Sequence, residues 1–96
     1  MRRKKVIRPK LPTAKPENYF VLVSGIPLKN IKELASSLES MNDWVFSHHV
    51  NESRNDFSAW INDVFKEPML AQDISMIKDI REMENVLHRY LVRKYV

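Results

Sequence analysis

The sequence predicts a mainly helical α+β fold, in which a short N-terminal β-hairpin packs on three to four helices and a long C-terminal helix follows. Aromatic and β-branched residues run together over Tyr19–Val23, just before the chain's one glycine, Gly25, as expected for a strand and its turn. Beyond the hairpin, apolar residues recur at helical spacing in several stretches separated by capping residues. At 96 residues the chain can bury one modest core, so we expect a single domain with a tail.

The tail is the basic, proline-containing arm at residues 1–18. It carries seven cations and three prolines, with no aromatic residue and almost no periodic apolar pattern. Such a segment buries too little apolar surface to offset the entropy lost when its backbone is ordered. We therefore expect residues 1–18 to be disordered or loosely docked, residues 19–74 to form a compact domain, and residues 75–96 to form the C-terminal helix.

The hairpin is predicted from two short apolar runs, Tyr19–Val23 and Ile26–Leu28, joined by Ser24–Gly25. Pro27 has no amide hydrogen to donate, which confines its strand to the edge of a sheet. Two strands alone are only marginally stable in water. One face of the hairpin must therefore lie on the helices that follow.

Three helices are predicted between residues 30 and 65. The first begins at Asn30, a helix cap paired with Glu33, and carries one apolar stripe as far as about Met41. A short second helix is expected over residues 43–50, and a third over residues 56–65. The stripe residues of the first helix are Ile31, Leu34, Ala35, Leu38 and Met41, and those of the third are Phe57, Trp60, Ile61 and Val64.

The last part of the chain predicts a short helical piece after Pro68 and a long helix capped by Ser75. The long helix has a heptad-like seam made of Met76, Ile80, Met83, Leu87 and Tyr90. About two heptads are too few to establish a coiled coil from the pattern alone. The helix is therefore expected either to dock on its own domain or to form a homodimer through Met76–Tyr90.

The net charge of +4 is unevenly distributed along the chain. Residues 1–16 carry a charge of +7, residues 17–85 carry −6, and residues 86–96 carry +3. The acidic body favours protein contacts, because it would repel nucleic acid, whereas the basic ends are suited to phosphates. The chain has no cysteine and no apolar run near the roughly 20 residues that span a bilayer, so we expect a cytoplasmic protein without a membrane partner.

The histidine pair His48–His49 is the first candidate for chemistry. Adjacent helix residues point about 100° apart, so the two rings cannot chelate one ion as i, i+4 histidines do. No HExxH-type spacing, glycine-rich phosphate loop or nucleophile elbow accompanies them. Asp56 is explained by its place at a helix start, where the macrodipole favours an acid. We therefore predict a protein that is not an enzyme, with no catalytic residue, no metal and no cofactor.

Two kinds of binding surface are predicted. The first is a polar group denser than helix capping requires, which we interpret as a surface for a protein partner, used alone or with the C-terminal helix. Its residues are His48, His49, Asn51, Asn55 and Asp56. The alternative is a nucleic acid, either RNA in a ribonucleoprotein or DNA, held by the basic ends through counterion release. Its candidate residues are Arg2, Arg3, Lys4, Lys5, Arg8, Lys10, Arg89, Arg93 and Lys94.

The stretch Tyr19–Ile74 resembles an uncharacterised domain of unknown function that occurs in archaeal and bacterial proteins. That family has no assigned activity, so the resemblance implies a compact helical module and no catalytic residue. The chain departs from the family pattern at Ser24–Gly25, where an acidic residue is expected before the glycine, and at Lys66, where a glycine is expected to end the helix. The residues that carry the resemblance are Lys29–Asn30, Leu34, Phe46, His49–Val50–Asn51, Asn55–Asp56–Phe57, Trp60 and Asp63–Val64–Phe65.

Overall fold

The computed structural model describes residues 9–95 of the chain. This part contains a two-stranded antiparallel hairpin followed by helices, of which the last is the longest. The predicted fold class is therefore confirmed. In chain order the elements are the 3₁₀ turn η1 (Pro16–Asn18), β1 (Phe20–Val21), β2 (Pro27–Leu28), α1 (Ile31–Leu38), α2 (Asp43–His49), α3 (Asp56–Phe65), α4 (Pro68–Ile74) and α5 (Ile80–Lys94).

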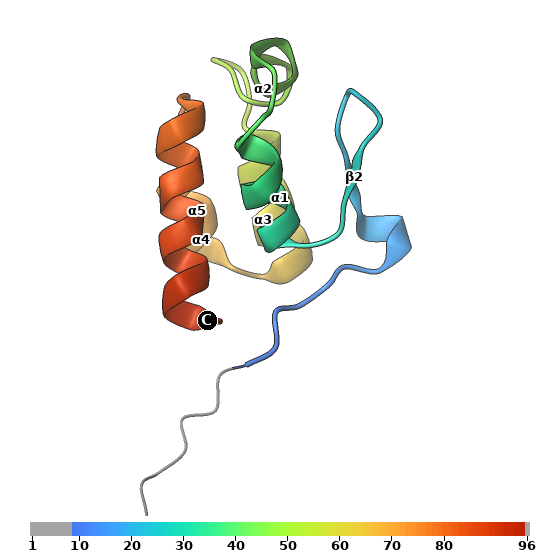
Figure 1. The fold of residues 1–96 in the computed structure, drawn as a ribbon, viewed down its shortest axis with the longest axis vertical. Coiled ribbons are helices and arrows are strands. Elements are labelled where there is room, and N and C mark those ends of the chain that lie inside the picture. The colour runs from blue at the N-terminus through green and yellow to red at the C-terminus, as the bar shows by residue number, and fades with distance from the viewer. Residues whose placement is uncertain (1–8, 96) are drawn as a thin grey trace, which may run out of the picture.

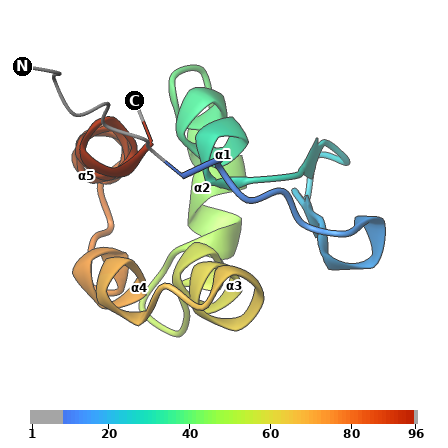
Figure 2. The same cartoon turned by 90° about the horizontal axis from the view of Figure 1, so that it is seen from below.

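The hairpin stands at one edge of a group of helices (Figures 1 and 2). Helix α1 packs along α5, and α3 packs along α4. Seen from below, α4 and α5 lie on one side of the molecule and the hairpin lies on the other, beyond α1 and α3 (Figure 2). Helix α2 lies at the end of the molecule where the hairpin turn is found (Figure 1).

The core is formed where the apolar stripes of the helices meet. The predicted apolar stripes are confirmed for Ile31, Leu34, Ala35 and Leu38 and for Phe57, Trp60 and Ile61. The first helix was predicted to reach about Met41, but α1 ends at Leu38, so Met41 lies beyond it; Met41 and Val64 are only partly buried. Burying a side chain as large as leucine contributes about 1.5–3 kcal/mol relative to leaving it in water. The largest side chains with almost no exposed surface are Phe57, Ile31, Leu34, Leu38, Ile61, Ile74, Met83 and Leu87.

The hairpin is shorter than the sequence predicts, and it depends on the helices for its stability. Each strand has two residues, with Phe20 opposite Leu28 and Val21 opposite Pro27. The ring of Phe20 points inward, and its centroid lies 5.1 Å from that of Phe57 and 5.7 Å from that of Trp60. Aromatic pairs at these distances contribute about 0.5–1.5 kcal/mol beyond the area that they bury. Phe20 is therefore one of the contacts that fix the hairpin on α3, together with the buried side chains of Leu22 and Leu28 in the same core.

Asparagine and aspartate caps set where three of the helices begin. The Oδ1 atoms of Asn30 and Asn55 accept hydrogen bonds from the amides of Glu33 and Ser58, at 2.8 and 3.0 Å. These bonds satisfy amides that have no partner within the helix. Helix α3 has the bounds that the sequence predicts. Helix α5 is capped in the same way by Asp79, whose Oδ2 accepts from the amide of Glu82 at 2.8 Å.

The start of α5 was predicted wrongly. Ser75 does not cap α5 but ends α4, since its amide and its hydroxyl both donate to the carbonyl of Gln72. The predicted first seam residue, Met76, precedes the helix and is 82% exposed. Met83 and Leu87 are fully buried within the chain. The described structure therefore uses the middle of the seam for docking on its own domain rather than presenting it to a second copy.

The end of the predicted arm is held against the body. The amide of Ala14 donates to the carbonyl of Lys29 at 2.8 Å, and Ala14 is 8% exposed. The indole Nε1 of Trp60 donates to the carbonyl of Asn18 at 2.8 Å. These contacts dock residues 14–18 on the body through backbone polar groups, because this part of the chain has few apolar side chains to bury. Residues 1–8 lie outside the described residues, and with them the candidates Arg2, Arg3, Lys4, Lys5 and Arg8.

Lys66 ends α3 in a conformation that suits glycine. Its φ and ψ are 55° and 46°, in the left-handed region, and its amide donates to the carbonyl of Asn62. A side chain in this region costs about 1–2 kcal/mol, because Cβ approaches the following carbonyl. A lysine at this position thus coincides with local backbone strain.

We expect Lys66→Gly to raise the free energy of unfolding by about 0.5–1 kcal/mol, because relief of the strain exceeds the extra chain entropy of glycine. Urea-induced unfolding followed by circular dichroism measures the difference. Lys32→Gly is the matched control, since Lys32 is also exposed but lies inside α1, where glycine should destabilise by about 1 kcal/mol. A loss of stability in Lys66→Gly would contradict the prediction.

Candidate functional site

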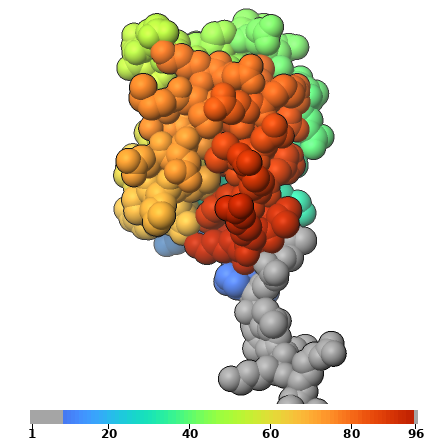
Figure 3. All heavy atoms as spheres, turned by 90° about the vertical axis from the view of Figure 1, so that its left-hand side faces the viewer, coloured from blue at the N-terminus to red at the C-terminus, as the bar shows by residue number. Residues whose placement is uncertain are grey.

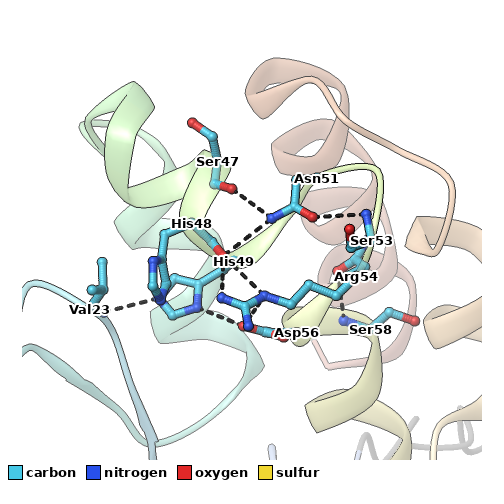
Figure 4. Close-up of polar contacts among 10 residues, drawn as sticks. Val23, Ser47, His48, His49, Asn51, Ser53, Arg54, Asp56 and Ser58 are labelled. Atoms are coloured by element: carbon cyan, nitrogen blue, oxygen red, sulfur yellow. Dashed lines mark hydrogen bonds and ion pairs between the residues drawn. The ribbon is translucent and has the colours of Figure 1, made fainter.

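His49, the last residue of α2, lies at the centre of the predicted polar group. It is 5% exposed and joins three parts of the chain. Its Nε2 accepts a hydrogen bond from the amide of Val23 at 3.0 Å, and its Nδ1 lies 2.9 Å from Oδ2 of Asp56 (Figure 4). An amide can only donate, so Nε2 carries no proton and Nδ1–H donates to the carboxylate. His49 is therefore a neutral bridge between the hairpin and α3.

Asp56 receives support from a second side chain. The Nε atom of Arg54 lies 3.6 Å from Oδ2 of Asp56, the oxygen that accepts from the imidazole. The guanidinium also donates to the carbonyl of His48 through Nη2, at 2.7 Å (Figure 4). Asp56 stands in the first turn of α3, where the helix dipole favours a negative charge. The carboxylate is thus held by groups of its own chain.

The two asparagines of the predicted surface also serve the fold. Asn51 closes the turn after α2, since its Nδ2 donates to the carbonyl of Ser47 at 3.0 Å and its Oδ1 accepts from the amide of Ser53 at 2.9 Å. Asn55 caps α3, and its Nδ2 donates to the carbonyl of Ile74 at 2.8 Å. Of the five predicted partner-binding residues, His48 is the one whose ring is exposed and makes no side-chain hydrogen bond that the structure describes.

This arrangement limits the chemistry available at the histidine. A carboxylate on Nδ1 is the partner that orients a general base, which would then act through Nε2. Here Nε2 already accepts from the amide of Val23, and the ring is buried against Phe20, with centroids 4.9 Å apart. A substrate would have to displace the hairpin to reach the imidazole. The geometry supports a structural role for the pair His49 and Asp56.

Sequence reasoning missed the exposed apolar residues beside this pair. Trp44 is 59% exposed and lies one helical turn before His48 on α2. The hairpin that hydrogen-bonds to the end of α2 exposes three further apolar side chains, Val21, Val23 and Ile26. The available signal was the position of Trp44 outside the apolar side of its own helix. We call Val21, Val23, Ile26, Trp44 and His48 the hairpin–α2 surface.

The predicted basic residues of α5 border a groove between α4 and α5. This groove has a volume of about 730 Å³ and is lined by Arg89 and Arg93, among others. The ammonium of Lys94 lies 2.9 Å from Oε1 of Glu67. The other carboxylate oxygen of Glu67, Oε2, accepts a hydrogen bond from the hydroxyl of Tyr90 at 2.7 Å. The charge of Lys94 is therefore already balanced by a carboxylate of its own chain. Figure 3 shows α4 and α5 side by side on this face.

Glu67, Tyr90 and Lys94 all have pKa values shifted from their ordinary values. Burial raises the pKa of the Glu67 carboxyl, but hydrogen bonds from Tyr90 and Lys94 outweigh it, so the pKa lies below its ordinary value. The hydrogen bond to Glu67 raises the pKa of Lys94, and burial raises that of Tyr90. A lowered carboxyl pKa stabilises the fold at neutral pH, and this contribution is lost as the pH falls through the folded-state pKa.

Lys10 lies beside the C-terminal half of α5. It lines a groove of about 440 Å³ together with Leu11 of the N-terminal segment, Lys32 of α1, and Leu91 and Tyr95 at the end of α5. The described chain begins close to where α5 ends (Figures 1 and 3). Within the described residues, Lys10 therefore lies near the basic end of α5.

Comparison with family models, curated proteins and solved structures finds no match to this chain. The resemblance of residues 19–74 to an uncharacterised family stays a prediction. Within residues 9–95, no helix has the length and apolar content that crossing a bilayer requires. The functional argument therefore depends on the geometry of the chain itself.

We expect His49→Ala to lower the free energy of unfolding by about 2–4 kcal/mol, because it leaves the amide of Val23 without its partner and opens a cavity beside Phe20. Chemical denaturation measures the change. His48→Ala removes the neighbouring exposed ring and should alter stability by less than about 0.5 kcal/mol. Equal losses in the two variants would show that His49 is not the bridge between hairpin and helix.

Proposed function

We propose that this chain is a small non-enzymatic binding module of the cytoplasm, which recognises a protein partner through the hairpin–α2 surface. Trp44 is the observation that carries the proposal. It is 59% exposed, whereas Trp60, the other tryptophan of the chain, is 7% exposed. Tryptophan is enriched among the residues that dominate binding energy, because its large ring gains much from leaving water and its N–H can still donate.

The neighbours of Trp44 support the same assignment. Single exposed apolar residues are common on soluble proteins and need no explanation. Here, however, the exposed fractions of Val21 and Ile26 reach 60% and 56%, and both residues stand on the element joined to the end of α2. Exposed apolar side chains gathered on adjoining elements are typical of interaction sites. The acidic body also favours a protein over a nucleic acid at this surface.

The hydrogen bonds of His49, Asn55 and Asp56 give this surface a fixed shape. The bonds from His49 to Val23 and Asp56 hold the hairpin at the end of α2 (Figure 4). A surface that is already ordered loses less conformational entropy on binding, which favours affinity. We therefore assign contact with the partner to Trp44 and His48, and positioning of the surface to His49, Asn55 and Asp56.

We expect Trp44→Ala to weaken partner binding by at least about tenfold, as removal of a central aromatic residue does in other interfaces. Proteins retained by the immobilised wild-type chain are compared with those retained by the variant, and the affinity of each is then measured. Met76→Ala is the matched control, because Met76 is 82% exposed but lies between α4 and α5. Unchanged binding by Trp44→Ala would remove the hairpin–α2 surface from the proposal.

Binding of RNA or DNA phosphates is the second candidate function. It is supported by the position of Lys10, which lines a groove together with Tyr95 at the end of α5. Arg93 and Lys94 belong to the last turn of the same helix. In Figure 1 the C-terminal end of α5 lies at the opposite end of the molecule from α2 and the hairpin turn. The two functions would therefore not compete for one surface.

For this candidate we expect affinity for single-stranded RNA to fall by about 10³–10⁵ between 50 and 200 mM salt, if six to ten phosphates are contacted. Fluorescence anisotropy with a labelled oligonucleotide measures this. Replacing Arg2, Arg3, Lys4, Lys5 and Arg8 by Gln should abolish binding, whereas replacing Lys66 and Lys78, which are exposed on the body, should not. Affinity that is independent of salt would exclude the basic ends as the binding element.

A further inference from the structure

Three side chains with metal-binding atoms converge on the outer side of the α1–α5 contact. Glu39 follows the last residue of α1, and Glu84 and His88 stand one turn apart on α5. Nε2 of His88 lies 3.6 Å from Oε2 of Glu84 and 4.0 Å from Oε1 of Glu39. One ligand atom from each residue can be chosen so that all three lie within 4.8 Å of one another.

These distances are close to those in the coordination shell of a zinc ion. Ligand atoms 2.0–2.2 Å from a tetrahedral zinc lie about 3.3–3.6 Å from one another. The contact from His88 to Glu84 already has this length, and the contact to Glu39 is longer by a few tenths of an ångström. The side chains of Glu39 and His88 are 62% and 45% exposed, so they have room to close this gap. Water can fill the fourth position.

The remaining contacts of the cluster orient the ligands. Nη1 of Arg81 pairs with Oε1 of Glu84, which leaves Oε2 directed at the imidazole. Nη2 of Arg81 donates to the carbonyl of Glu39 at 3.1 Å and so ties the end of α1 to α5. Outer groups that hold a ligand in this way are typical of metal sites in proteins. The side chain of Glu84 is 13% exposed, and its position is therefore well fixed.

We propose that Glu39, Glu84 and His88 bind a divalent zinc ion that links the end of α1 to the middle of α5. The imidazole separates this set from ordinary surface carboxylates, because nitrogen ligands favour zinc over magnesium and calcium. Two carboxylates supply the negative charge that the ion requires, and Arg81 offsets part of it. The site uses none of the residues of the hairpin–α2 surface and does not depend on the function proposed for it.

Titration of the full, untagged and chelator-treated chain with zinc chloride tests the site. Calorimetry should show one ion bound per chain, and zinc should raise the midpoint of thermal unfolding, because the ion binds the folded state. His88→Gln and Glu39→Gln should each weaken binding by at least about tenfold, the loss expected when even an outer contact of a metal site is removed. His48→Gln is the matched control, because His48 is also an exposed histidine of a helix.

Three results would overturn the proposal. The first is that zinc at about 1 mM produces neither a heat of binding nor thermal stabilisation. At this concentration even a weak specific site would be partly occupied. The second is binding that persists in His88→Gln and disappears in His48→Gln. The third is equal stabilisation by magnesium chloride, which would indicate carboxylates acting without the imidazole. Thermal unfolding of each variant without metal checks that it is folded.

Discussion

The two-stranded hairpin is not stable by itself and depends on its contacts with the helices. Each strand has two residues, too few for independent stability. The helices supply what is missing through His49, which accepts from the backbone of Val23 and donates to Asp56. Phe20 adds apolar contact with Phe57. One imidazole thus joins the hairpin, α2 and α3, and its burial is acceptable because both ring nitrogens have partners.

The sequence predicts the parts of the fold that local interactions determine. Helices α1 and α3 have clear apolar stripes, and Asn30 and Asn55 make the capping contacts expected of them. The start of α5 was harder to predict, because Ser75 and Asp79 are both good caps. The choice between them depends on tertiary packing, since Ser75 is occupied in ending α4. A local pattern cannot show which of two suitable residues the fold will use.

The predicted polar residues show even more clearly that contacts made by tertiary packing cannot be read from a local pattern. The sequence predicts a polar group that includes His49, Asn51, Asn55 and Asp56, but it cannot show that the groups they contact belong to the same chain. The bond from Asn55 to the carbonyl of Ile74, for example, requires α4 to return beside α3. The grouping of Glu39 with Glu84 and His88 likewise requires α1 to lie against α5, and only the i, i+4 spacing of the last two is visible in the sequence.

The dependence of the hairpin on later parts of the chain has a consequence for biosynthesis. Val23 is 26 residues from its partner His49, and Asn18 is 42 residues from Trp60. A ribosome releases the hairpin first, before the groups that hold it have been made. Closing loops of this length costs entropy that only the completed contacts repay. We therefore expect the nascent hairpin to stay open until α3 has been synthesised, which leaves Leu22 and Leu28, buried in the folded chain, exposed to solvent during that interval.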